Sequence, residues 1–412
     1  MSAKIANPFR PGAGHAPPYL AGRDAEKTEF KKLLLQEIIL QNLILTGLRG
    51  VGKTVLLDEL KPLAIAEKWL WVGTDLSESA SVNEDALVRR LLADLSVVTA
   101  AITITEAKPP KGLSVVPEKE KKILSYHALL RKYESEPGLP SDKLKALLEF
   151  AWKCLSGFGI KGVVFAYDEA QTMVDHKKEK QFPLSLLLDV FQSIQKKGVP
   201  FMLVLVGLPT LFPKLVEART FSERMFDVLT LGRLSPEDSS KAITRPIAMS
   251  KCPVQFADLS VSMVIETSGG YPYFIQFICK ELYDLFLQQM EVGKPESVPI
   301  DVILKKLDKD FFSGRWSRAT DRQKDLMVTI ANLRSCDDEF SVQEIAVESK
   351  KSDKPFTPSH INQMLSTLID SGLIYKNRYG RYAFAVPLLG AFIRRQEREE
   401  REWKQTVLQF PK

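Results

Sequence analysis

The sequence predicts an α/β protein, in which a parallel sheet covered by helices on both faces precedes helices and a small C-terminal domain. Short apolar runs alternate with helical stretches up to about residue 235, as in sheets whose parallel strands are joined by crossover helices. A glycine-rich phosphate-binding pattern lies at 47–54, between an apolar run and a helical stretch. After Pro236 the pattern becomes helical, and a hairpin is predicted near the C-terminus.

The elements of the first 235 residues follow from apolar periodicity and from capping residues. A helix is expected from Asp24, as its cap, to about residue 36, and a buried strand follows over 42–46. Further strands are expected at 69–76, 163–167, 201–206 and 226–231, and further helices at 55–60, 83–98, 144–155 and 184–197.

Prolines and glycines interrupt this alternation between about residues 99 and 141. Within that stretch, 118–133 is charged and is expected to be helical. We interpret the stretch as an insertion. It is either a solvated, variable excursion or a functional lid or clamp.

The pattern G-x-x-x-x-G-K-[ST] predicts a phosphate cradle between the strand at 42–46 and the helix that follows. Glycines let backbone N–H groups turn toward phosphate, and the helix N-terminus adds a positive dipole end. Lys53 would reach the β- and γ-phosphates, and the Thr54 hydroxyl would hold Mg²⁺. The alternative is a glycine-rich turn that fits the pattern by chance. The residues expected at the nucleotide are Gly47, Leu48, Arg49, Gly50, Val51, Gly52, Lys53, Thr54 and Val55.

An acidic pair, Asp168 and Glu169, follows the apolar run at 163–167. Ligands of open α/β sheets bind at the carboxyl ends of the strands, where this pair is expected. Asp168 would hold Mg²⁺ through water, and Glu169 would orient and deprotonate the attacking water. The alternative is that the two acids only cap the next helix.

The composition excludes several classes of protein. The chain of 412 residues is 45% hydrophobic and 26% charged, and it contains no apolar run long enough to cross a membrane. Its four cysteines are widely spaced, which predicts reduced thiols in a cytoplasmic protein, and its four scattered histidines argue against a histidine-based metal site. The formal charge of +6 is compatible with nucleic acid but does not require it.

The C-terminal region predicts a winged helix-turn-helix. A helix is expected at 321–331, a capping box at Ser341 begins a second, and Thr357-Pro358 begins a third. A hairpin of 373–376 and 381–384 would form the wing. The expected core face of the third helix is Ile361, Met364, Leu365, Leu368 and Ile369.

The phosphate loop, the acidic pair with the following Ala170-Gln171, and the upstream segment 20–24 together resemble the AAA+ ATPases. The resemblance covers about residues 7–395. Within the AAA+ ATPases, the chain most resembles the bacterial and archaeal branch near origin-recognition initiators, transposition-regulating ATPases and STAND switch ATPases. It implies a sheet order of 5-1-4-3-2 with a helical lid after the fifth strand. It also implies ATP and Mg²⁺ as ligands.

The resemblance implies roles for residues outside the two motifs. Gly22 and Arg23 would pack on adenine, and Tyr271 and Pro272 would bring a lid helix to the base. A helix N-terminus is the simpler interpretation of the latter pair. Arg224 would act as an arginine finger on a neighbouring subunit, with Arg219 as the second candidate, although either arginine could form an ordinary ion pair. Thr210 is placed where a polar sensor residue is expected, at the end of the fourth strand, but Gly207-Leu208-Pro209 occupies the usual sensor position. The usual lid arginine has no clear counterpart.

We therefore expect four parts: an AAA+ core at 1–235 with the insertion at 99–141, a lid at 236–305, a winged helix at 306–395 and a charged tail at 396–412. The mixed charge of that tail predicts a solvated helix.

In a winged helix the third helix enters the major groove of DNA and the wing follows its backbone. Basic residues flank the helix, in accord with phosphate contacts to double-stranded DNA, although winged helices also dock proteins and Asp337-Asp338-Glu339 lies in the same domain. The expected base-facing positions are Ser359, His360, Asn362, Gln363, Ser366 and Thr367, and the expected phosphate-contacting residues are Lys350, Lys351, Lys354, Lys376, Arg378 and Arg381, with Tyr379 at the tip of the wing.

The sequence thus predicts an ATPase that converts ATP and water to ADP and phosphate, slowly and under stimulation by a partner. Its nucleotide state would control DNA binding or assembly on DNA. The alternatives are a STAND-type signalling or defence switch, whose winged helix docks protein or autoinhibits, and a nucleotide-binding regulator that scarcely turns over. Self-assembly into a homo-oligomer and a protein partner are further expectations, and a membrane is not expected.

Overall fold

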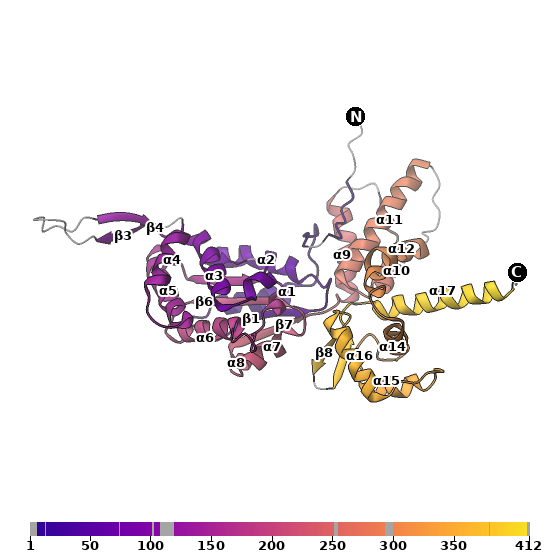
Figure 1. Ribbon diagram of the computed structural model, residues 1–412. Helices are drawn as coiled ribbons and strands as arrows, with labels where there is room; N and C mark the ends of the chain where they lie inside the picture. The colour runs from indigo at the N-terminus through magenta and orange to yellow at the C-terminus, as the bar shows by residue number, and fades with distance from the viewer. Residues whose placement is uncertain are drawn as a thin grey trace, which may run out of the picture. The chain divides into compact units, whose positions relative to one another are not determined.

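The computed structural model describes residues 6–12, 14–73, 75–100, 103–107, 119–250, 254–292, 300–378 and 380–409 (Figure 1). Its backbone contacts divide the chain into two compact units. The sheet unit comprises Arg23–Gly47 and Lys53–Thr230. The C-terminal unit comprises Leu231–Lys412 together with Met1–Gly22 and the short segment Leu48–Gly52.

A five-stranded sheet organises the sheet unit, in the order β2-β5-β6-β1-β7. β5 and β6 are parallel, with Val163 opposite Phe201, and β6 and β1 are parallel, with Leu43 opposite Val204. Read from the other edge, this order confirms the predicted 5-1-4-3-2. The strands are β1 (Asn42–Gly47), β2 (Trp69–Val72), β5 (Gly162–Tyr167), β6 (Phe201–Gly207) and β7 (Phe226–Leu231).

Both faces of the sheet are buried. Along β5 the side chains of Val163, Phe165 and Tyr167 belong to the large apolar cluster formed with α3, α4, α5 and α6. The intervening Val164 and Ala166 point to the opposite face and are also buried. This burial on both sides explains why the strands are continuous apolar runs in the sequence. The larger helices of the unit are α1 (Asp24–Leu34), α2 (Lys53–Ala66), α3 (Glu84–Thr99), α4 (Tyr126–Ser135), α5 (Pro140–Leu155), α6 (Pro183–Lys196), α7 (Leu211–Ala218) and α8 (Ser222–Met225).

Two predicted boundaries are wrong. Arg23, not Asp24, occupies the cap position of α1. Asp24 is the first helical residue, where its carboxylate interacts favourably with the positive end of the helix dipole. The second strand ends at Val72 rather than at residue 76, because β2 pairs with β5 only from Trp69 to Val72.

The predicted insertion divides into two parts. Residues 119–123, expected to be helical, form β4 (Lys119–Ile123), which pairs antiparallel with β3 (Thr103–Ala107) and stands apart from the helices in Figure 1. Pairing with β3 thus overrides the helical preference of a Lys- and Glu-rich segment. The second part, from Leu124 through α4, is not a solvated excursion, because Leu124, Leu129 and Tyr133 are buried in the core.

The first half of the C-terminal unit is a helical subdomain. Phe9 packs beside Tyr283 of α11, and the Asn7 side-chain amide donates to the backbone oxygen of Lys280 at 2.9 Å. The N-terminal segment is therefore fixed to the lid helices, although it was expected to belong to the AAA+ core. These helices are α9 (Pro236–Met249), α10 (Asp258–Ser268), α11 (Pro272–Val292) and α12 (Ile300–Leu307).

The second half of the C-terminal unit is the predicted winged helix. Ser341 and Glu344 form the predicted capping box, and Thr357 caps the third helix, whose first residue is Pro358. A single helix, α17 (Leu389–Gln409), crosses the boundary expected at 395 and contains most of the predicted tail. The other elements are η4 (Asp308–Phe312), α13 (Ser313–Trp316), α14 (Asp321–Ala331), α15 (Val342–Ser349), α16 (Pro358–Asp370), β8 (Ile374–Arg378) and β9 (Arg381–Phe384).

Phe274 and Phe277 of α11 lie in the same apolar cluster as Phe312, Leu365 and Phe392 of the winged-helix region. The lid and the winged helix therefore share a core. Within the described ranges, no helix is both long and apolar enough to span a bilayer.

We expect Leu129→Ala to reduce the free energy of unfolding by about 2–5 kcal/mol, because the side chain is fully buried in the main core. Chemical denaturation measures this. Glu134→Ala, on the exposed face of the same helix, is the control. Equal midpoints for the two variants would show that α4 is not part of the core.

Candidate functional site

The phosphate loop lies between the end of β1 and the start of α2. Gly50 and Gly52 have φ of 80° and 90°, a conformation that glycine adopts without strain. The Lys53 ammonium donates to the backbone oxygen of Gly47 at 2.9 Å, across the ends of the loop. Val51 is buried, and the Gly50 carbonyl accepts a 3.1 Å bond from the Tyr273 N–H within the C-terminal unit.

The two predicted motifs meet at Thr54 and Asp168. The Thr54 hydroxyl donates to Asp168 Oδ2 at 2.5 Å, although 114 residues separate them in the chain. Asp168 is only 5% exposed. Two hard oxygen atoms therefore lie together beside the first turn of α2, as a Mg²⁺ site requires.

Glu169 adopts a left-handed backbone conformation, with φ of 52° and ψ of 29°. Its N–H donates to Asp168 Oδ1 at 2.7 Å, and its side chain is exposed. A non-glycine residue in this region costs about 1 kcal/mol or more, a cost often found at functional sites. The Thr172 hydroxyl donates to the Glu169 carbonyl at 2.9 Å and stabilises the turn.

Sequence reasoning missed two further acids beside this site. Desolvation raises the pKa of Asp58, Lys61 opposes the rise, and the charges of Asp168 and Asp75 reinforce it. Asp75 also forms a parallel backbone bridge with Asp168. Asp58 was detectable, because it follows Thr54 by four residues on α2 and so lies on the same helix face.

Gln171 was also missed as a site residue, although it follows the acidic pair by two residues. Its Oε1 accepts a 3.0 Å bond from the Leu208 N–H, and its Nε2 donates to the Glu169 carboxylate. Thr210 occupies the cap position before α7, where its side chain makes no capping bond.

The two candidates for an arginine finger, Arg219 and Arg224, differ in their surroundings. Arg219 forms a bidentate ion pair with Asp189, with N–O distances of 2.8 and 2.7 Å, which is the ordinary role considered for it. Arg224 is exposed on α8, immediately before β7.

The residues predicted around the base lie at two turns. Gly22 has φ of 61°, and Arg23 is buried and pairs with Glu26 at 3.4 Å. Pro272 is the first residue of α11, and the half-buried Tyr271 precedes it, so this segment is a helix N-terminus as the simpler interpretation held. Their contact with nucleotide stays a prediction.

All six predicted base-facing residues of α16 are exposed, and four of the five predicted core residues are buried. The Thr367 hydroxyl accepts a 3.0 Å bond from Gln323 and is therefore already engaged. On the wing, Arg381 pairs with Glu344 at 3.1 Å. After α15, Lys351 pairs with Glu348 at 2.7 Å. Tyr379 and the Arg378 side chain lie outside the described residues.

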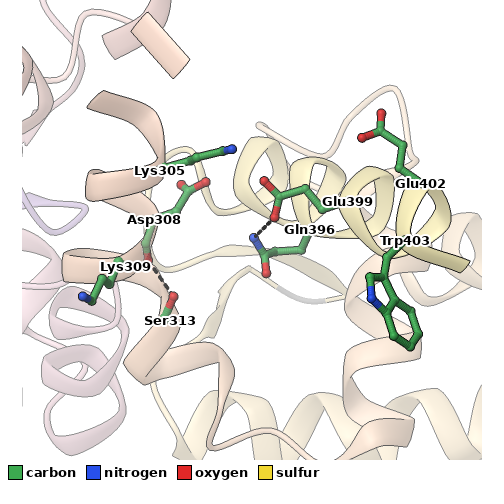
Figure 2. A pocket seen from close by; sticks show the side chains of 8 residues that line it. All are labelled: Lys305, Asp308, Lys309, Ser313, Gln396, Glu399, Glu402 and Trp403. Carbon is green, nitrogen blue, oxygen red and sulfur yellow. Dashed lines mark hydrogen bonds between the residues drawn. The ribbon is translucent and has the colours of Figure 1, made fainter. Parts of the chain in front are cut away.

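A separate open hollow of about 520 Å³ lies between α12, η4 and α17 (Figure 2). Its lining combines lysines with carboxylates, and its Asp308 already forms a salt bridge with Arg395 at 2.5 Å. It contains no predicted site residue. The lining residues are Lys305, Asp308, Lys309, Ser313, Gln396, Glu399, Glu402 and Trp403.

A family model described as "Domain of unknown function (DUF8462)" matches residues 309–393, which contain the winged helix. A search of curated proteins finds no match to the sequence.

Solved structures resemble the chain along most of its length. The Walker-type ATPase of Pyrococcus abyssi is 15% identical, with 91% of this chain and 96% of that chain covered and a TM-score of 0.53. The ORC2 protein of Aeropyrum pernix in its ADP form is 14% identical, with 94% and 97% covered and a TM-score of 0.53. With the observed strand order, these likenesses establish the AAA+ fold, followed by a winged helix.

Proposed function

We propose that this protein is an ATP-binding and ATP-hydrolysing switch that couples its nucleotide state to DNA binding or to assembly on DNA. The observation that carries the proposal is the contact between Thr54 of the phosphate loop and Asp168 of the acidic pair. An accidental glycine-rich turn would not bring its hydroxyl to a buried carboxylate at the end of another strand.

Lys53 now bonds to the Gly47 carbonyl and would exchange that acceptor for the β- and γ-phosphates of ATP. Loop N–H groups and the N-terminus of α2 would bind the remaining phosphate oxygens. Glu169 would accept a proton from the attacking water, because its exposed carboxylate follows the metal-side acid directly.

Thr54 and Asp168 fit a magnesium ion. In the described part of the chain no three acidic, histidine or cysteine side chains converge on a metal position. Phosphate and water oxygens would therefore complete the coordination shell, as is usual for Mg²⁺ at nucleotides. The bound ion would neutralise phosphate charge during transfer.

Lys53→Ala is expected to abolish nucleotide binding, whereas Glu169→Gln should preserve binding and slow turnover about 100-fold or more. The difference arises because Lys53 binds the ground state and Glu169 acts on water. Fluorescent-nucleotide titration and phosphate release measure the two effects. Hydrolysis by Glu169→Gln at the wild-type rate would contradict the role proposed for Glu169.

We further propose that ATP drives self-assembly and that Arg224 reaches the γ-phosphate of a neighbouring subunit. Its exposure on α8 supports this choice over Arg219, whose charge Asp189 neutralises.

Mixing Arg224→Ala with Glu169→Gln subunits should restore part of the activity that each variant lacks, because mixed assemblies contain intact composite sites. ATPase assays across mixing ratios test this, with the exposed Arg245→Ala as the control. A wild-type protein that hydrolyses ATP normally while remaining monomeric with a non-hydrolysable analogue would exclude action between subunits.

The winged helix is proposed to bind duplex DNA through α16. Its exposed face carries the short polar residues Asn362 and Gln363, whose amides suit adenine edges. Lys350 and Lys354 are exposed just before it and are available for phosphate contacts. The pairing of Arg381 with Glu344 makes the wing a weaker phosphate contact than its sequence suggested.

Duplex affinity should fall steeply with salt, and Lys350→Ala with Lys354→Ala should weaken binding on all sequences alike and flatten that dependence. Asn362→Ala or Gln363→Ala should instead reduce preference among sequences. Fluorescence anisotropy over a salt series, in ATP and in ADP, gives both quantities.

The charge-matched control is Lys305→Ala with Lys309→Ala, which removes two exposed lysines that belong to α12 and η4 and not to α16 or the segment just before it. Equal losses in the two double variants would indicate a general charge effect. A salt-insensitive signal, or none in either nucleotide, would favour a winged helix that docks protein or autoinhibits.

A further inference from the structure

We infer that Gln171 is a positioning residue that holds the Glu169 carboxylate and links it to the end of β6. The inference rests on the proposed ATPase function. Its basis is the amide geometry: the oxygen of the Gln171 side chain accepts from the Leu208 N–H at 3.0 Å, and the nitrogen donates to Glu169 Oε2. Each end of the amide therefore has the partner that its chemistry requires.

The end of β6 is shaped to receive this side chain. A Cβ added at Gly207 would lie 2.5 Å from Gln171 Oε1 and 3.0 Å from Leu211, so any larger residue would displace the amide. Gly207 belongs to the segment that occupies the usual sensor position of the AAA+ ATPases, where a polar side chain would be typical. Glycine there leaves space for Gln171, which brings an amide to the same place from the acidic turn.

The backbone of Gln171 is also fixed. The Lys214 ammonium donates to its carbonyl oxygen at 2.9 Å, and burial lowers the pKa of that lysine. The bonds from Leu208 and Lys214 thus attach Gln171 to β6 and α7. A displacement of the end of β6 would be transmitted through the amide to Glu169.

The bond from Gln171 leaves one oxygen of the Glu169 carboxylate available as a proton acceptor. With Oε2 of Glu169 bonded to Gln171, Oε1 remains to accept the proton of the attacking water. A displacement of a reacting group by about 1 Å can lower the rate strongly. Loss of the amide should therefore lower kcat while nucleotide binding is unchanged.

The test compares two variants of Gln171. Gln171→Met has similar size but neither donates nor accepts. Gln171→Glu retains an acceptor for the Leu208 N–H but loses the donor and places a second negative charge against Glu169. Both should lower kcat about 10- to 100-fold, with KM for ATP and nucleotide affinity unchanged. Gln192→Met, on the half-buried surface of α6, makes the matched chemical change and should leave kcat unaltered.

Single-turnover rates in a Glu169→Gln background separate positioning from general support of the structure. If Gln171 acts through Glu169, then Gln171→Met should cause no further loss once the carboxylate is gone. The same fold-loss in both backgrounds would overturn the inference. Thermal unfolding identifies any variant that fails to fold.

Gly207→Ala approaches the same contact from β6. It should reduce kcat in the wild type and have no added effect in a Gln171→Ala background, where the amide is absent. Equal losses in both backgrounds would contradict the inference.

The outcomes distinguish the inference from the proposed function. If Glu169→Gln slows hydrolysis and neither Gln171 variant does, only the inference fails. A wild-type rate no higher than that of Lys53→Ala would overturn both.

Discussion

The parallel pairing of β5, β6 and β1 is the constraint on which the candidate site depends. Tyr167 pairs with Leu205, and Thr46 pairs with Gly207, so the three strands end at one edge of the sheet. Asp168 and Gln171 follow one strand, Leu208 follows the second, and the phosphate loop follows the third. Backbone hydrogen bonds thus bring together residues that are more than 100 positions apart.

The turn at Glu169 has an unfavourable backbone conformation, which hydrogen bonds around it stabilise. Glu169 is left-handed without being glycine, and two donors, its own N–H and the Thr172 hydroxyl, stabilise the turn around it. The Leu76 N–H donates to the Asp168 carbonyl at 3.0 Å, which fixes the turn to the loop after β2. A residue held in this way presents its carboxylate in a defined direction, which suits the role in orienting water that we propose for Glu169.

The C-terminal unit has a different organisation. Its lid helix α11 begins with Pro272, and two residues later Phe274 enters a cluster shared with Phe312 and Phe392. Separating the lid from the winged helix would expose these aromatic side chains, at about 25 cal/mol for each Å² of apolar surface. The α16 helix, in contrast, presents polar residues to solvent and buries only its apolar face. The core therefore fixes α16 without occupying its outer surface.

The sequence by itself determined the local chemistry and the period of each element. Apolar runs indicated all five strands of the main sheet, capping residues indicated α15 and α16, and two motifs identified Lys53, Thr54, Asp168 and Glu169, whose roles stay predictions. These signals are local, since a cap, a glycine turn or a buried strand depends on residues within a few positions. The order of the strands came from the family resemblance carried by those motifs.

Tertiary structure decided what depends on distant partners. Lys119–Ile123 is a strand because β3 pairs with it, although its composition favours a helix. Arg219 forms an ion pair because α6 presents Asp189, whereas Arg224 remains exposed. Gln171 meets Glu169 and Leu208 only because β5 and β6 are parallel neighbours and Gly207 leaves space for its amide. Such contacts depend on strand register and on the volume of remote side chains, which no local pattern encodes.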